Sequence, residues 1–408
     1  MSKGKENKIH IGIFGRRNIG KSSLINHLTG QDIAIVSDIA GTTTDPVKKS
    51  VEIPEIGAVI IIDTAGIDDT GTLGEMRIKK SFQALKTVDM AIIVFADNTF
   101  EAAEQNLIQE CKKLEIPYFI IHNKSDLHPL DNIVKKQIET TYSTDVVDYS
   151  TRSSKPELLL PYLKKYIPEH SFQNKSLLGG LLQYGDIVLL VTPIDIEAPE
   201  GRIILPQIQA IRDILDNDSI AIVLKERELD VFFRKTNIKP KLVICDSQVI
   251  LKADASVPSE IPLTGFSILL AYHKGNFDQY LRGTPKLSSL KDGDKVLILE
   301  SCTHQVSCDD IGRVKIPRWL SNYTGKKLEF DVVSGLDKLP QDITKYSMVI
   351  QCGGCVITKR QLYNRLKPAI DAGVPVTNYG MAIAYLQGVY NRAIQPFVKN
   401  TTQGEDYL

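Results

Sequence analysis

The sequence predicts an α/β protein made of three segments, and two observations carry this prediction. Short, almost wholly apolar runs alternate with polar, helix-compatible stretches along the chain, as expected for parallel strands that are buried on both faces. The chain of 408 residues is also too long for one ordinary hydrophobic core, so two or three domains are expected.

The first segment, residues 1–170, alternates most regularly. Helix-compatible stretches separate its apolar runs, so we expect a doubly wound, parallel-type sheet with crossover helices. The expected strands are IHIGIF, AVIIIDT, MAIIVFAD and PYFIIHNK, and the expected helices are KSSLINHLTG, EMRIKKSFQALKT and FEAAEQNLIQECKKLE.

Two further α/β segments are expected after a linker at residues 167–186. Residues 175–262 carry the strand-like IVLLVTPID, SIAIVLKE and PKLVICDS. A unit this small buries a modest core, so pairing with a second copy is expected. The Pro- and Gly-containing stretch ASVPSEIPLTG is read as a second break. Residues 266–408 then hold the strand-like KVLILESC, KLEFDVVSG and SMVIQCGG.

The composition gives no support to several classes of partner. With 49 basic and 49 acidic residues the formal net charge is zero, which does not favour nucleic acid or an anionic membrane. No apolar run reaches the roughly 18 residues of a membrane helix. The polar start MSKGKENKIH does not resemble a signal peptide, so a cytoplasmic location is expected.

A phosphate-binding motif, GRRNIGKS at residues 15–22, follows the first strand and opens the first helix. This context is typical of a P-loop, in which backbone N–H groups turn toward phosphates. Lys21 is expected to reach the β and γ phosphates, and Ser22 to bind Mg²⁺. The residues expected to form this cradle are Gly15, Asn18, Gly20, Lys21, Ser22 and Ser23.

Four further stretches indicate that the nucleotide is GTP. Thr43 in GTTTD is expected to close on Mg²⁺ when the γ-phosphate is present. In DTAG, Asp63 is expected to hold Mg²⁺ through water, and the Gly66 N–H to meet the γ-phosphate. Asp126 in NKSD can accept from the N1–H and 2-amino groups of guanine. The fourth stretch, DYSTRSS, holds Ser150 and Thr151 where a backbone contact to guanine O6 is expected. Asn123 and Lys124 of NKSD complete the expected guanine site.

These motifs resemble those of the tRNA-modification and ribosome-assembly GTPases, which share N-x-G-K-S-S and G-T-T-x-D. The resemblance implies that Asn18 binds K⁺ and that hydrolysis is stimulated by K⁺. Ile67 stands where Ras-like enzymes carry a water-orienting glutamine. Glu75 lies about where some potassium-dependent relatives place a glutamate, and its alternative role is that of a solvated residue in the first turn of a helix.

Two groups of cysteines near the end of the chain indicate a metal site. SCTHQVSC supplies Cys302, His304 and Cys308, and QCGGC supplies Cys352 and Cys355, each just after an expected strand. Thiolates from two loops suit zinc or an iron–sulfur cluster. Cys302, His304, Cys352 and Cys355 could hold zinc, and Cys308 would be a spare thiol. A redox pair is the alternative, although such pairs rarely recruit a distant Cys-x-His.

The remaining cysteines, Cys111 and Cys245, are isolated in apolar or helical contexts. We expect them to be small buried hydrophobic residues rather than ligands.

The GTPase motifs, the short middle segment and the C-x-H … C-G-G-C pattern together resemble the maturation GTPases of FeFe hydrogenases, the HydF family. The stretch TPIDIEAPEGRIILPQIQAIRDILD, residues 192–216, is also similar to that family's middle domain. The resemblance implies three domains: a GTP-binding domain at 1–170, a dimerisation domain at 175–262 and a cluster-binding domain at 266–408.

The family resemblance further implies a scaffold with a 4Fe-4S cluster bound by Cys302, Cys352 and Cys355. Such a scaffold receives a two-iron precursor made with two radical S-adenosylmethionine enzymes and passes it to the apo-hydrogenase. Many members have a histidine where this chain has Gln351. The fourth ligand is therefore open among His304, a carboxylate such as Asp195, and water.

The nucleotide state is expected to control docking or release of the partner enzymes, since the γ-phosphate moves the switch loops. Residues 71–81, GTLGEMRIKKS, could transmit this signal or could simply begin an amphipathic helix. Two rival functions remain from the sequence: a zinc-stabilised GTPase of RNA modification or ribosome assembly, and a GTP-regulated redox sensor.

Overall fold

The computed structural model describes residues 8–29, 46–68, 72–168, 176–193, 204–301, 310–335 and 339–398, without the side chains of residues 72–77. It divides into two compact units, residues 1–174 and 175–408, which are described separately. The helices in the described part of the chain are all too short or too polar to cross a bilayer.

The first unit contains a six-stranded sheet in the order β2-β3-β1-β4-β5-β6. All neighbouring strands are parallel except β2 and β3, which are antiparallel. Its elements are β1 (Ile9–Gly15), α1 (Lys21–Thr29), β2 (Val47–Ile53), β3 (Gly57–Asp63), α2 (Thr72–Leu85), β4 (Met90–Ala96), α3 (Ala102–Lys113), β5 (Tyr118–Asn123), α4 (Asn132–Tyr142), β6 (Val146–Asp148) and α5 (Leu160–Tyr166).

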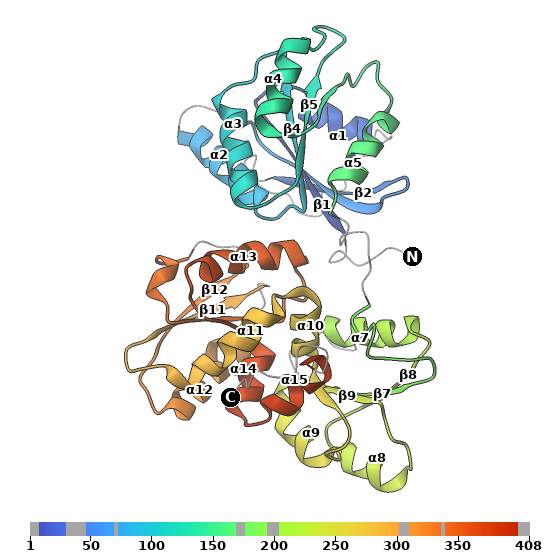
Figure 1. Ribbon diagram of the computed structural model, residues 1–408, viewed down its shortest axis with the longest axis vertical. Coiled ribbons are helices and arrows are strands. Elements are labelled where there is room, and N and C mark those ends of the chain that lie inside the picture. The colour runs from blue at the N-terminus through green and yellow to red at the C-terminus, as the bar shows by residue number, and fades with distance from the viewer. Residues whose placement is uncertain are drawn as a thin grey trace. The chain divides into compact units, whose positions relative to one another are not determined.

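Each face of this sheet packs on its own set of helices (Figure 1). Successive strand residues point to opposite faces, so Ile13 packs in the same core cluster as α1 and α5, whereas Phe14 packs in the cluster of α2, α3 and α4. Residues Met90–Ala96 of β4 are all buried. The apolar runs that predicted β1, β3, β4 and β5 are confirmed as strands that pair in parallel with one another and lie between two layers of helices.

The second unit contains two four-stranded parallel sheets, ordered β10-β9-β7-β8 and β12-β11-β13-β14. Elements of the first of these sheets are β7 (Ile187–Val191), α7 (Leu205–Asp216), β8 (Ile220–Leu224), α8 (Leu229–Lys235), β9 (Leu242–Cys245), α9 (Ile250–Ser256), β10 (Leu263–Gly265) and α10 (Phe266–Lys274). Elements of the other are α11 (Phe277–Gly283), β11 (Lys295–Glu300), α12 (Ile316–Thr324), β12 (Glu329–Ser334), β13 (Met348–Gln351), α13 (Lys359–Asp371), β14 (Val376–Asn378), α14 (Tyr379–Leu386) and α15 (Tyr390–Val398).

One hydrophobic core joins the two sheets of this unit, since a single cluster of buried side chains runs from Leu178 to Phe397. Polar contacts cross the same boundary: Thr264 Oγ1 of β10 donates to the Ala393 carbonyl at 2.8 Å. The stretch 255–265, interpreted from the sequence as a break, contains the edge strand β10. The predicted division into a middle and a C-terminal domain stays a prediction.

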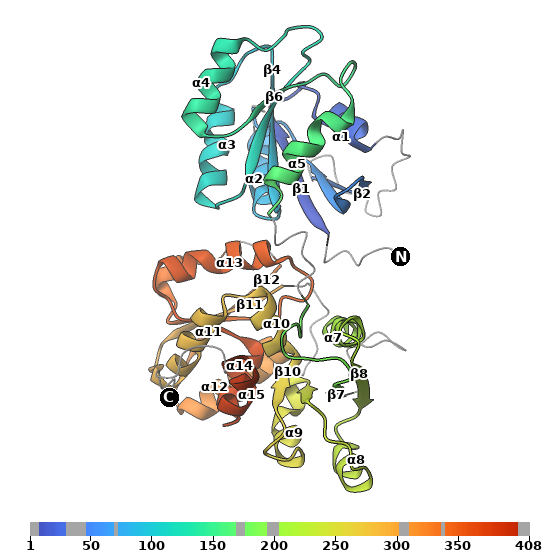
Figure 2. The ribbon, with the colours of Figure 1, turned by 45° about the vertical axis from the view of Figure 1, so that its right-hand side comes forward.

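The last sheet contains a reversal in its connections. From β11 the chain crosses through α12 to β12 on one side, and from β13 it crosses through α13 to β14 on the other. Right-handed crossovers in opposite directions place α12 and α13 on opposite faces, as Figures 1 and 2 show. A crevice is expected outside the carboxyl ends of β11 and β13, where ligands bind in open α/β sheets.

Candidate functional site

The β1–α1 loop has the backbone geometry of a phosphate cradle. Asn18 and Gly20 have positive φ angles of 61° and 89°. A Cβ on Gly20 would lie 2.4 Å from Asn123 Nδ2, so only glycine fits there. The Asn123 side chain donates to the Ile19 carbonyl at 2.8 Å. The loop that predicts phosphate binding and the motif that predicts guanine binding are therefore in direct contact.

Lys21 and Ser22 begin α1 at the mouth of this cradle. Lys21 is buried, and its Nζ donates to the carbonyls of Gly15 at 2.9 Å and Arg16 at 2.6 Å. Ser22 Oγ donates to Asp63 Oδ2 at 2.9 Å, which brings the two expected magnesium-site residues together. Burial raises the pKa of Asp63, and the Ser22 hydrogen bond and the charges of Lys21 and Lys49 oppose this.

The DTAG segment docks on the same loop. Thr64 Oγ1 donates to the Ile13 carbonyl at 2.7 Å, and the Ile67 N–H donates to the Gly15 carbonyl at 3.3 Å. A Cβ on Gly66 would lie 3.0 Å from the Arg17 nitrogen. Gly66 therefore lies beside the cradle, and the contact of its N–H with a γ-phosphate stays a prediction.

The ends of β5 and β6 form the expected guanine site. Ser150 Oγ donates to Asp126 Oδ1 at 2.6 Å and accepts from the Arg152 N–H. The Ser125 N–H donates to the Tyr149 carbonyl at 3.2 Å. These bonds hold the Asp126 carboxylate beside the Ser150 backbone, the pairing that recognition of the guanine edge needs. Of the other expected nucleotide-site residues, Lys124 has a φ of 64°, Thr151 is half-buried, and Ser23 is exposed on α1.

The structure adds two nucleotide-site contacts that the sequence did not predict. Arg16 of the cradle bonds the fully buried Glu104 of α3, with Nε to Oε1 at 2.7 Å. Asp68 Oδ1 accepts from the Arg17 N–H at 2.7 Å. The sequence does carry a signal for the Arg16–Glu104 contact, because a glutamate stands on the apolar face of a helix. The Arg17–Asp68 contact depends on loop geometry, for which the sequence has no such signal.

Two expected nucleotide-site residues are outside the described part of the molecule. Thr43 lies in residues 30–45, and the side chain of Glu75 lies among residues 72–77. Their predicted roles in switching and hydrolysis remain predictions.

The expected metal site lies at the reversal in the last sheet. β11 and β13 are parallel neighbours, with Leu299 paired to Gln351. Cys352 follows β13, and its Sγ accepts from the Ser301 N–H at 3.1 Å and donates to Ser301 Oγ at 3.0 Å. Ser301 directly precedes Cys302, so the two cysteine-bearing loops start from adjacent strand ends, as predicted. Cys302, His304 and Cys308 lie outside the described residues, as does Asp195.

Cys355 lies beyond the two glycines of the same loop. Gly354 has a φ of 66°, which favours glycine, and both Cys352 and Cys355 are free thiols. Burial raises the pKa of Cys355, the negative charge of Cys352 adds to this, and the Lys274 ammonium lowers it. In contrast, Cys111 and Cys245 are fully buried among apolar residues, which confirms that they are structural.

The surroundings of Cys352 fit a soft, sulfur-containing group. The hydroxyls of Tyr280 and Tyr379 are buried and have no hydrogen-bond partner among the described residues. Burial, and then the charge of Cys352, raises the pKa of both phenols, so each stays a potential donor toward sulfur. Among the described residues, no group of three or more His, Cys, Asp or Glu side chains could hold a metal ion.

Three protein-family models match the chain in succession. Residues 10–124 match the 50S ribosome-binding GTPase model, residues 177–275 the Hydrogen maturase F dimerization domain, and residues 278–396 the Hydrogen maturase F tetramerization domain. The two hydrogen maturase F models together cover more than half of the chain.

Characterised relatives match a smaller part. The chain is 33% identical over 189 residues to the tRNA modification GTPase MnmE of Helicobacter acinonychis, covering 45% of this chain and 41% of that protein. It is 33% identical over 168 residues to GTPase Era of Ruminiclostridium cellulolyticum, covering 39% and 55%. The chain therefore spans about half the length of these relatives or less.

Solved structures give similar coverage. Aquifex aeolicus Era bound to GDP.AlF4- matches with 21% identity and a TM-score of 0.34, over 53% of this chain and 92% of that one. The G domain of the Thermotoga maritima FeoB transporter matches with 19% identity and a TM-score of 0.31, over 41% and 99%.

The matched models follow the order of the predicted segments. The GTPase model matches the first unit, which holds the phosphate cradle and the guanine site, and the two hydrogen maturase F models match the second unit. The first unit is a P-loop GTPase domain that hydrolyses GTP. The expectation drawn from the joint pattern of GTPase motifs and C-terminal cysteines is confirmed, and the chain belongs to the hydrogen maturase F family.

Proposed function

We propose that this GTPase is also a 4Fe-4S scaffold and carrier that receives a two-iron precursor and delivers it to apo FeFe-hydrogenase. One observation carries the proposal: in a hydrogen maturase F chain, the Cys352 thiol lies at the carboxyl end of β13 against Ser301, the residue before Cys302. The precursor is cargo in this scheme, and two radical S-adenosylmethionine enzymes are the expected suppliers.

The cluster would be held by Cys302, Cys352 and Cys355, with His304, Asp195 or water completing the set. A cluster bound by three thiolates supplies one exchangeable coordination position, which suits a carrier that must release its cargo. The chain's own contribution would be to bring the two cysteine-bearing loops together from adjacent strand ends and to place the buried hydroxyls of Tyr280 and Tyr379 near Cys352.

In the GTPase domain, Lys21 would neutralise the β and γ phosphates while Ser22, Asp63 and Thr43 hold Mg²⁺. Asn18, held at a positive φ beside the phosphates, would bind K⁺. Because Ile67 replaces the water-orienting glutamine and is buried, another group must orient the water, and Glu75 is the candidate. Turnover in KCl should exceed turnover in NaCl, and equal rates would exclude the potassium role.

The GTPase would act as a switch rather than in cluster chemistry, with the γ-phosphate ordering the loops that dock or release partner enzymes. Self-association through residues 175–262 would produce a homodimer, since the chain matches the family's dimerization domain at 177–275. We place this process in the cytoplasm, without a membrane or nucleic-acid partner.

Anaerobic reconstitution with iron and sulfide, followed by EPR of the dithionite-reduced protein, tests the scaffold. We expect a reduced 4Fe-4S signal that is lost in Cys302→Ala, Cys352→Ala and Cys355→Ala, with GTP hydrolysis unchanged. Cys308→Ala is the matched control and should keep the signal. A persistent signal in the Cys352→Ala protein would remove that thiol from the ligand set.

Metal analysis of the same preparations distinguishes the rival function. One tightly bound zinc per chain and no iron signal would favour a zinc-stabilised GTPase of RNA modification or ribosome assembly. The curated relatives named for tRNA modification are the reason to include this outcome, although they match less than half of the chain.

A further inference from the structure

Lys274 is buried in a place where lysine is unusual. It is the last residue of α10, and only 8% of its surface is exposed. A buried ammonium must be paired or hydrogen-bonded to offset its lost hydration. The contacts of Lys274 must therefore offset the free-energy cost of burying its charge.

Three hydrogen bonds of Lys274 go to the CGGC loop and the residues just after it. Lys274 Nζ donates to the carbonyls of Gly354 at 3.4 Å, Cys355 at 3.4 Å and Ile357 at 3.2 Å. These three carbonyls surround the position of Cys355. A side chain about 80 residues away in the sequence thus holds residues 354–357, the second half of the loop, by hydrogen bonds to their main chain.

The two halves of this loop are held differently. The first half is fixed by the sheet, since the Cys352 N–H donates to the Leu299 carbonyl at 2.9 Å. The second half follows Gly353 and Gly354, which have no side chains with which to pack. Without the Lys274 bonds, the main chain around Cys355 would lose three of its hydrogen-bond acceptor contacts.

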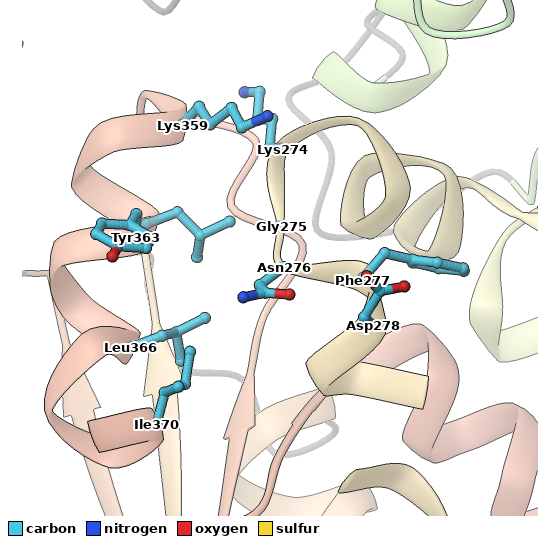
Figure 3. A pocket seen from close by; sticks show the side chains of 10 residues that line it. Lys274, Gly275, Asn276, Phe277, Asp278, Lys359, Tyr363, Leu366 and Ile370 are labelled. Atoms are coloured by element: carbon cyan, nitrogen blue, oxygen red, sulfur yellow. The ribbon is translucent and has the colours of Figure 1, made fainter. Parts of the chain in front are cut away.

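Lys274 also borders a cavity of about 320 Å³ between the start of α11 and one face of α13 (Figure 3). Lys274 and Lys359 lie at one end of it, and Ile370 lies toward the other. Lys359 is exposed, whereas Lys274 is buried. The cavity therefore offers both a matched control lysine and space for a larger cation at position 274.

We propose that Lys274 is a positioning residue of the cluster loop, which fixes Cys355 through three backbone carbonyls and places a positive charge beside this ligand. The first part depends only on the geometry of the chain, and the second rests on the proposed cluster function. A cluster with three thiolates is an anion and becomes more negative on reduction. A nearby cation therefore favours the reduced form and raises the midpoint potential.

Three substitutions separate the hydrogen bonds from the charge. Lys274→Met removes both, Lys274→Gln keeps N–H donors without charge, and Lys274→Arg keeps donors and charge, with the adjoining cavity to accommodate its size. Lys359→Met is the control at the same cavity. The unfolding transition of the second unit should be retained in all four full-length proteins, which reports that the unit holding residues 274 and 359 is folded in each variant.

The first measurement needs no cluster. In cluster-free protein, amide hydrogen exchange at Ile357, whose N–H donates to the Gly354 carbonyl, should be about tenfold faster in Lys274→Met. The Cys352 amide, held by β11, should be unchanged and serves as the internal standard. Exchange in Lys274→Arg and Lys359→Met should match the wild type. Unchanged exchange at Ile357 in the Met variant would overturn the positioning role.

The second measurement is the midpoint potential of the reconstituted protein. It should become more negative in Lys274→Met and Lys274→Gln and stay near the wild-type value in Lys274→Arg and Lys359→Met. Equal potentials for the Gln and Arg variants would overturn the charge part, even if the Met variant failed to fold. Faster exchange combined with no cluster in the wild type would instead refute the proposed function and keep the positioning of the loop.

Discussion

At the scale of single residues, Asp68 places a carboxylate on the phosphate cradle. Its Oδ1 accepts from the Arg17 N–H at 2.7 Å, although the side chain is exposed. A γ-phosphate entering this part of the cradle brings like charge near that carboxylate. The repulsion disfavours GTP relative to GDP, by about 1 kcal/mol or less for a solvated pair. We therefore expect Asp68 to shift the binding preference of the domain toward GDP.

We expect Asp68→Asn to raise the affinity for a non-hydrolysable GTP analogue relative to GDP, by up to about fivefold at low salt. The asparagine keeps a hydrogen-bond acceptor for Arg17 and removes only the charge. Equilibrium titration with fluorescent analogues of both nucleotides measures the ratio. The difference should shrink as salt is added, because exposed charges are screened. A ratio that stays at the wild-type value in low salt would argue against this repulsion.

At the scale of elements, a buried ion pair connects the phosphate cradle to α3. Glu104 Oε1 accepts from Arg16 Nε at 2.7 Å, and its Oε2 accepts from the Glu101 N–H at 3.0 Å, closing the first turn of α3. Arg16 also contacts the Glu101 side chain at 3.3 Å. One fully buried carboxylate therefore sets both the start of a helix and the conformation of the loop beside the nucleotide.

Glu104→Leu should destabilise the first unit by about 3–5 kcal/mol, because it leaves the Arg16 guanidinium without its buried partner. Arg16→Met alone should be destabilising for the converse reason. The double variant should be more stable than the sum of the two losses predicts, since both members of the pair are then gone. Thermal unfolding of the four proteins provides this cycle. Simple additivity would mean that the two side chains are not energetically coupled.

The length and polarity of each element decided what the sequence could predict about the fold. Longer strands that are buried on both faces, such as Met90–Ala96, form apolar runs that the sequence shows clearly. The edge strand Val47–Ile53 was missed because its first half is polar, with an exposed Lys48, a half-buried Lys49 and an exposed Ser50. Three further strands, β6, β10 and β14, have three residues each and are too short to show a pattern.

In the candidate sites, too, some contacts could be predicted from the sequence and others could not. The motif spacing predicted the Ser22–Asp63 and Asp126–Ser150 pairs, because these motifs constrain side chains that are functionally linked. The Lys274 contact with the CGGC loop was not predicted. A lysine at the end of a helix ordinarily extends into solvent, and only the packing of α10 against that loop encloses it.

At the scale of the whole molecule, the second unit is expected to unfold as one body although it holds two sheets. A single core cluster extends through both of them. Hydrogen bonds also cross the boundary, a buried one from Thr264 to the Ala393 carbonyl at 2.8 Å and a partly buried one from Ser267 Oγ to Asn378 Oδ1 at 3.0 Å. The GTPase unit has separate core clusters of its own. Calorimetry of the full chain should therefore show two transitions rather than three.

Two perturbations assign those transitions to their units. GDP with Mg²⁺ at about 100 times its Kd should stabilise only the GTPase transition, by about 2.7 kcal/mol. Leu190→Ala, at a fully buried position of β7, should lower only the other transition, by about 2–5 kcal/mol. Hydrogen exchange should then accelerate in β11 and β13 as well as in β7, because the sheets share one core. Acceleration confined to β7–β10 would show instead that the two sheets unfold independently, as separate middle and C-terminal domains.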